Sequence, residues 1–124
     1  MQPAQAKFLL QPPAGAIREL DRIKHVAAYP PGAVIFVQGQ AARGVFIVCE
    51  GQVKLVSNTQ HGNALILKFA GSGDILGLPS VITGTSYGHR AETIRAAQLA
   101  FVAAEDFLAF LKENRDALSR VPKI

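Results

Sequence analysis

Short apolar runs separated by glycine-containing segments dominate the middle of the chain. Residues 34–37, 45–49, 52–56 and 64–69 are rich in Val, Ile, Leu and Phe, and the run 52–56 alternates polar with apolar residues. Alternation with a period of two is typical of a half-buried strand. Because the runs recur roughly every 8–12 residues, they predict an all-β sandwich or barrel. Glu50-Gly51, between two of the runs, favours a tight hairpin turn.

The second half of the chain continues this pattern with one interruption. Residues 78–82 contain Pro79 at a position that suits the first turn of a short helix. Two more strands are expected at 89–97 and 98–104. Tyr87 and His89 border the loop between the helical turn and these strands. They either line a pocket or are exposed loop residues, and we expect both to be exposed.

Helical periodicity flanks the strands at both ends. Apolar positions recur at helical spacing over 15–25, and an amphipathic helix begins at Glu105. A further helical turn is expected over 114–121. Residues 1–13 hold three of the seven prolines and predict a flexible N-terminal arm. The remaining residues, 14–124, are expected to form one domain.

Composition fits a single cytoplasmic domain and offers little catalytic chemistry. The 124 residues are 49% hydrophobic and carry a formal net charge of +4, with the basic residues scattered along the chain. Scattered basic residues are not typical of a nucleic-acid-binding surface. No apolar stretch approaches the roughly 18 residues that a membrane helix needs, and the N-terminal segment lacks the pattern of a signal peptide. Cys49 is the single cysteine and is expected to be a small buried residue in a reducing compartment.

Metal-binding and catalytic patterns are not found. The three histidines, His25, His61 and His89, lack the spacing of metal ligands. Ser80, Ser86 and Ser119 show no sequence pattern with His and an acid that would indicate a hydrolase triad. We therefore expect no catalytic residues, no metal site and no required cofactor.

Glycines and strands of this order resemble the cyclic nucleotide-binding domain of the Crp/Fnr family of transcription regulators. The resemblance runs from about Tyr29 to Leu118. Its motifs are Pro31-Gly32, Phe36-Val37-Gln38-Gly39, the segment 45–54, Gly62, Gly73-Asp74-Ile75-Leu76-Gly77 and Arg90-Ala91-Glu92. The resemblance implies a mainly β fold, a double-stranded β-helix (jelly roll) with flanking short α-helices.

The resemblance also implies a phosphate-binding cassette, which reads Gly-Glu-Leu and then Arg-Ser or Arg-Thr before Ala in the family. Gly77 and Arg90 hold the Gly and Arg positions here. Both also have a structural interpretation, in which Gly77 only forms a turn and Arg90 pairs with Glu92 or Asp74. The Gly lets backbone approach the cyclic phosphate, the helical turn directs N–H groups at it, and the Arg supplies charge. Pro79 removes one backbone donor, and Ser80 is a candidate replacement.

Two positions depart from the family pattern. Leu78 stands where the family has the Glu that accepts from the ribose hydroxyl, and Ala91 stands where it has Ser or Thr. An unpaired buried hydroxyl costs roughly 1–3 kcal/mol, or ~5- to 150-fold in affinity. The candidate ligand-binding residues are Gly77, Leu78, Pro79, Ser80, Arg90 and Ala91.

Two hypotheses follow. In the first, the chain is the ligand-sensing domain of a Crp/Fnr-type regulator and binds cAMP, cGMP or another small anionic effector. Family members continue into a dimerisation helix and a DNA-binding domain, which we do not expect within these 124 residues, so the chain is either a fragment of a larger regulator or stands alone. The chain alone is expected to bind no DNA and no membrane, and a homodimer is a candidate assembly. In the second, a degenerate fold binds no nucleotide and serves as a protein interaction or dimerisation module.

Overall fold

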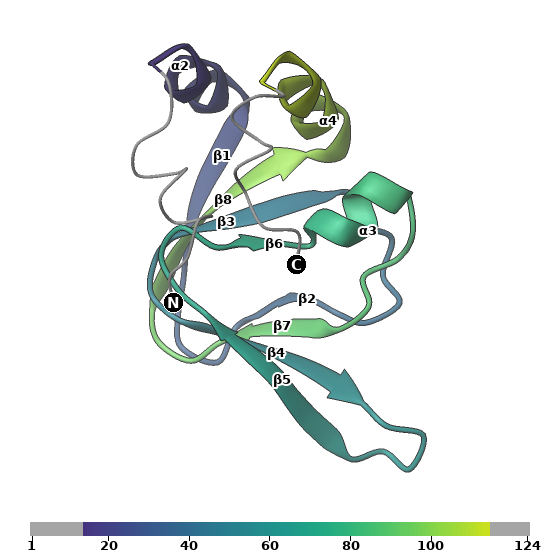
Figure 1. The fold of residues 1–124 in the computed structure, drawn as a ribbon. Coiled ribbons are helices and arrows are strands. Elements are labelled where there is room, and N and C mark those ends of the chain that lie inside the picture. Colours follow the sequence, from purple (N-terminus) through teal and green to yellow (C-terminus); the bar gives the residue numbers. More distant parts are fainter. Residues whose placement is uncertain (1–13, 115–124) are drawn as a thin grey trace.

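Two four-stranded antiparallel sheets pack face to face in the computed structural model, which describes residues 14–114 (Figure 1). The strand order is β1-β8-β3-β6 in one sheet and β2-β7-β4-β5 in the other. The strands are β1 Lys24–Tyr29, β2 Val34–Phe36, β3 Gly44–Glu50, β4 Val53–Asn58, β5 Ala64–Ala70, β6 Ile75–Leu76, β7 Arg90–Thr93 and β8 Ala97–Ala103. The expected mainly β jelly roll with short flanking helices is confirmed.

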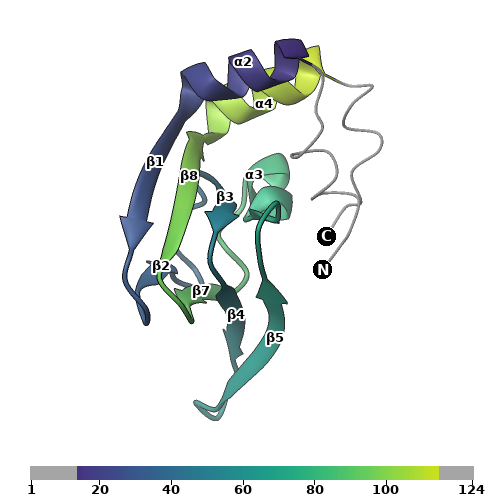
Figure 2. The same ribbon diagram turned by 90° about the vertical axis from the view of Figure 1, so that its left-hand side faces the viewer.

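Three helices accompany the sheets. Helices α2 (Ala14–Ile23) and α4 (Ala104–Glu113) lie side by side across one end of the first sheet, and α3 (Leu78–Thr83) connects β6 to the loop before β7 (Figures 1 and 2). Phe107 and Phe110 of α4 are each 1% exposed and pack with residues of β3 and β8. A second core fills the space between the two sheets, around Phe36, Leu55 and Leu99.

Three local expectations are wrong. The first helix ends at Ile23 rather than near 25, and the next six residues form β1, which pairs with β8. Glu50-Gly51 is not a hairpin turn, because β3 and β4 belong to different sheets and the chain crosses between them here. Cys49 is exposed rather than buried, and it lies where the pairing of β3 with β8 shifts register.

β7 is shorter than the strand expected over 89–97, whereas β8 has the expected length and begins one residue earlier. The segment expected to be extended over 89–97 contains only β7 and a bend before β8. The expected arm at 1–13 and most of the expected helical turn at 114–121 lie outside the described residues. In the described part of the chain, no helix has the length and apolar character to cross a membrane.

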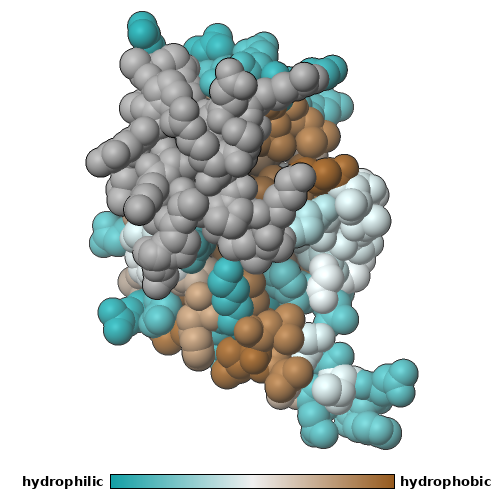
Figure 3. Space-filling model, viewed as in Figure 1, coloured by the Kyte–Doolittle hydropathy of each residue, from teal (hydrophilic) through white to brown (hydrophobic). Residues whose placement is uncertain are grey.

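Hairpin β4–β5 extends from the body of the domain (Figure 1). Its tip is hydrophilic and apolar surface lies nearer its base (Figure 3). β5 is an edge strand. Its exposed apolar side chains are Leu65, Ile66, Leu67 and Phe69.

Candidate functional site

A cavity of about 280 Å³ lies between the β6–α3 segment and the β4–β5 hairpin. This volume is near the lower end of the range for small-molecule sites, roughly 300–1,000 Å³. Sheet residues form one wall, the cassette segment forms another, and the residues just before β7 complete it. The lining residues are Leu55, Lys68, Ala70, Asp74, Ile75, Leu76, Gly77, Pro79, Ser80, Gly88 and His89.

Gly77 begins α3 in a left-handed conformation, with φ of 85°. A Cβ atom at this position would lie 2.7 Å from Cε1 of Tyr87. The position therefore excludes a side chain both by backbone conformation and by close packing. Pro79 and Ser80 follow in the first turn of α3 and also line the cavity. Three of the expected ligand-binding residues are thus brought together on one wall.

Tyr87 packs against this wall and contacts β2 and β3. Its hydroxyl donates a hydrogen bond to the Gly44 carbonyl of β3, and its ring stacks on Phe36 with centroids 3.8 Å apart. Burial raises the pKa of the Tyr87 hydroxyl. The expectation that Tyr87 is exposed is wrong, because the side chain is 3% exposed.

His89 lines the cavity and is half-buried rather than exposed, so that expectation is also wrong. Its Nε2 atom is buried without a hydrogen-bond partner in the described part of the protein. Burial lowers the pKa of the imidazole from its ordinary value of 6.5. The ring is therefore neutral at pH 7 and offers an unpaired polar atom near the cavity wall.

Arg90 is the cationic residue expected to bind phosphate, and it is placed differently. In β7, Arg90 pairs with Val56 and Glu92 pairs with Lys54, whereas Ala91 between them pairs with Leu55. Because side chains alternate along a strand, Arg90 and Glu92 share the face opposite to that of Ala91. Arg90, though described, does not line the cavity.

An ion pair holds the Arg90 side chain on that face. Its Nε lies 3.5 Å from Oε1 of Glu92, and Nζ of Lys54 lies 3.9 Å from Oε2 of the same carboxylate. The Arg90 Nε atom is buried and makes no hydrogen bond with another described residue, so the contact to Glu92 is electrostatic without good hydrogen-bond alignment.

Leu78 and Ala91, the two departures from the family cassette, are core residues. Leu78 is 7% exposed and packs in the cluster under α4, and Ala91 is fully buried between the sheets. Neither side chain carries a hydrogen-bonding group. The structure therefore contains no carboxylate or hydroxyl at these two positions.

Two charged residues of the cavity wall were missed in the sequence. Lys68 of β5 is half-buried and pairs with Leu55, so the two share the inner face of the sheet. Asp74 is 6% exposed, and its Oδ2 accepts a hydrogen bond of 2.9 Å from the Gly71 N–H. The glycines just before Asp74 predicted a turn at this residue. No sequence pattern marked Lys68, because its place on the inner face depends on how β5 pairs with β4. Within 14–114, no group of His, Cys, Asp and Glu side chains forms a candidate metal site.

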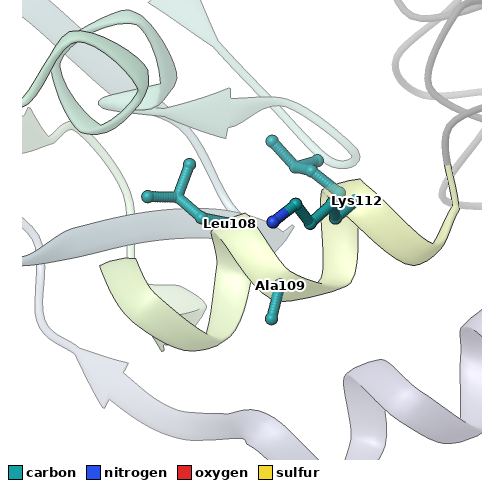
Figure 4. Close-up of a pocket in the computed structure, with 4 residues that line it drawn as sticks. Leu108, Ala109 and Lys112 are labelled. Atoms are coloured by element: carbon teal, nitrogen blue, oxygen red, sulfur yellow. The ribbon is translucent and has the colours of Figure 1, made fainter.

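A separate hollow lies on α4, away from the cassette. Its walls are Leu108, Ala109, Leu111 and Lys112. Leu108 and Lys112 are four residues apart and extend along one side of the helix, with Ala109 pointing elsewhere (Figure 4). None of the expected ligand-binding residues lines this hollow.

Comparisons with known proteins agree with the fold. The family model for the cyclic nucleotide-binding domain matches residues 26–114. The cyclic AMP receptor protein of Thermus thermophilus is 27% identical over 84 residues, which cover 68% of this chain and 39% of that protein. The cAMP-activated global transcriptional regulator CRP of Salmonella typhimurium is 27% identical over 100 residues, covering 78% and 47%.

Solved structures show the same fold. The catabolite activator protein of Thermus thermophilus superimposes with a TM-score of 0.80 at 22% identity, over 94% of this chain and 54% of that one. The chain spans less than half the length of the curated relatives named above. The family match covers most of the chain and includes both walls of the cavity. The chain therefore belongs to the cyclic nucleotide-binding domain family.

Proposed function

We propose that this domain is the ligand-sensing part of a Crp/Fnr-type transcription regulator and binds a cyclic nucleotide or another small anionic effector. The observation that carries the proposal is the cavity between the cassette turn and hairpin β4–β5, in a fold whose family is defined by cyclic nucleotide binding. Curated relatives named for cyclic AMP support the same ligand class.

The cassette wall supplies the donors for a phosphate group. Gly77 lines the cavity just before α3, and Ser80 in the first turn of α3 offers its N–H and hydroxyl. Pro79 contributes no N–H. Leu78 and Ala91 supply no polar group for a sugar or phosphate, so we expect affinity lower than in a complete cassette by about 5- to 150-fold for one unpaired hydroxyl.

A chain of contacts connects this wall to α4. Gly77 packs against Tyr87, and the Tyr87 hydroxyl bonds to the carbonyl of Gly44. The neighbouring carbonyl, that of Arg43, accepts a hydrogen bond of 2.8 Å from the N–H of Ala104, the first residue of α4. A ligand that shifts Tyr87 would therefore bias the position of α4, which is how a sensor passes on a signal.

The remaining parts of the proposal concern the whole regulator. We propose that the domain is not an enzyme, requires no cofactor, works in the cytoplasm and does not bind DNA by itself. DNA binding would belong to the rest of a full-length parent, and dimerisation of that parent would present the sensor domains in pairs. The relative from Salmonella typhimurium is a transcriptional regulator by name.

Isothermal titration calorimetry with cAMP and with cGMP tests the proposal, with thermal shift at millimolar nucleotide as a second measurement. Binding should be saturable with one site per chain, and ligand should raise the melting temperature. Ser80→Ala should weaken binding, whereas Ser72→Ala, an exposed serine outside the cavity, should not. An unchanged melting temperature and no heat with either nucleotide would contradict the proposal.

One observation favours the second function, a degenerate fold that serves as an interaction or dimerisation module. Arg90, the cassette arginine, is paired with Glu92 and does not line the cavity. If cAMP and cGMP leave the melting temperature unchanged, the interaction or dimerisation module is the better-supported function, because the ion pair holds Arg90 away from a ligand. Sedimentation velocity of the domain without nucleotide then distinguishes a dimerisation module from a monomer.

A further inference from the structure

The arrangement of β5 gives the cavity a cation that the family cassette does not use. Lys68 lies between Leu67 and Phe69, which are 52% and 55% exposed, yet Lys68 itself is half-buried. Its antiparallel partner is Leu55, a residue of the inner core. Alternation along β5 therefore turns Lys68 inward while its neighbours face outward.

Lys68 is the cationic side chain among the described residues that line the cavity. Asp74 is the one lining carboxylate in that set, and its Oδ2 is already bonded to the N–H of Gly71. His89 completes the titratable lining residues and is neutral at pH 7 because burial lowers its pKa. A ligand that enters the cavity with a negative charge thus meets its counter-charge on β5.

Lys68 also differs in its surroundings from the three described cations that form ion pairs. Lys24, Lys54 and Arg90 each lie within 4 Å of a carboxylate. In the described part of the chain, Lys68 has no acidic partner within that distance. A half-buried ammonium group without a partner gains more from an incoming anion than a paired one, because no existing contact has to be broken.

Arg90 is in the opposite situation. It lies on the other face of its strand, and its guanidinium is tied to Glu92, which Lys54 also neutralises. To reach the cavity, Arg90 would have to leave this carboxylate and pass to the inner face. The same alternation that turns Lys68 inward turns Arg90 outward.

We propose that Lys68, and not Arg90, provides the charge that holds the anionic group of the ligand. The ligand is a phosphate monoanion attached to a nucleoside-sized body, bound between the inner face of β5 and the cassette wall at Ser80. This inference rests on the proposed function, since it concerns the same cavity. It moves the charged contact from the cassette to the hairpin that forms the opposite wall.

Titration of cAMP and cGMP into single variants tests the assignment. Lys68→Met should raise Kd by about tenfold or more, as expected for loss of a charge-assisted contact, and Lys68→Arg should restore most of the affinity. Arg90→Gln should change Kd by less than about threefold. The matched control is Lys54→Met, which removes a lysine from the opposite face of the same sheet and should leave Kd unchanged.

The salt dependence of binding and a second variant, Lys68→Gln, distinguish the loss of a charge from a change in folding. Binding to the unaltered protein should weaken as salt is raised, and Lys68→Gln, which keeps a polar side chain, should show a weaker dependence. Inorganic phosphate at the same concentrations distinguishes a nucleotide from a free anion as the preferred ligand.

The outcomes separate the two proposals. If Arg90→Gln abolishes binding and Lys68→Met does not, the Lys68 assignment is wrong while the sensor function stands. If no cyclic nucleotide binds to the unaltered protein, both are wrong. If inorganic phosphate binds as tightly as the nucleotides, Lys68 binds an anion without recognising a nucleoside, and the ligand class proposed here is overturned.

Discussion

Replacing Gly77 with alanine should destabilise the domain by two separable effects. A left-handed conformation costs an L-residue about 1–2 kcal/mol, and the φ of Gly77 is 85°. The new Cβ would also lie 2.7 Å from Cε1 of Tyr87, and overpacking of this kind typically costs about 1–3 kcal/mol. Gly77→Ala should therefore lower the free energy of unfolding by about 2–5 kcal/mol.

Gly84, at the other end of α3, provides a matched control. Its φ is 71°, also left-handed, but an added Cβ would meet nothing within 4 Å. Gly84→Ala should therefore cost only the conformational part, about 1–2 kcal/mol. Urea denaturation followed by circular dichroism gives both values, provided that the m-values agree.

A double-mutant cycle isolates the contact with Tyr87. In a Tyr87→Ala background the clash is removed, so the cost of Gly77→Ala should fall to that of Gly84→Ala. Equal costs for the two glycine variants in the unaltered background would refute the reasoning, because they would show that Tyr87 does not restrict position 77.

Three further predictions concern the core and its titrating groups. Tyr87→Phe should lower the free energy of unfolding by about 1–3 kcal/mol, because the buried carbonyl of Gly44 loses its donor; an unchanged urea midpoint would contradict this. Phe107→Ala, at a site 1% exposed, should cost about 3–5 kcal/mol by the same assay, and a cost below about 1 kcal/mol would show that α4 is not packed as described. The pKa of His89 is lowered in the folded protein, so just below pH 6.5 the unfolded chain binds more protons than the folded one. The contribution of neutral His89 to stability should therefore be fully present above pH 6.5 and should be lost as the pH falls below it. Urea midpoints at about pH 5 and 7.5 should therefore differ less in His89→Gln than in the unaltered protein, and an equal difference would contradict the assignment to His89.

The sequence predicted those strands whose residues have high strand propensity. The runs that became β3, β4 and β5 are apolar, β-branched and bounded by turn residues. β1 was missed because most of its residues are exposed and its sequence, Lys-His-Val-Ala-Ala-Tyr, has little strand character. Its conformation is set by pairing with β8, for example Val26 with Ala100, and such long-range pairing is not visible in a local pattern.

The candidate site was predictable in its cassette and not in its opposite wall. Gly77 was identified because a family motif marks it, and Ser80 because it offers a replacement donor in the helical turn that follows; both line the cavity. Lys68 and the inward placement of His89 depend on which strands pair and in which register, since a shift by one residue would exchange inner and outer faces. For Arg90 the sequence left two interpretations open, a phosphate ligand or an ion pair with Glu92 or Asp74, and the structure contains the pair with Glu92.

Nuclear magnetic resonance most directly tests the claim that an anionic ligand binds between the cassette and β5. Titration of the ¹⁵N-labelled domain with cAMP or cGMP should shift the amide resonances of Lys68, Gly77, Ser80 and His89 with one common saturation curve. Amides on the far side of the domain, such as Val26 on β1, should move little. Shifts concentrated on the α4 hollow, or no saturable shift at the cavity with either nucleotide, would contradict the account.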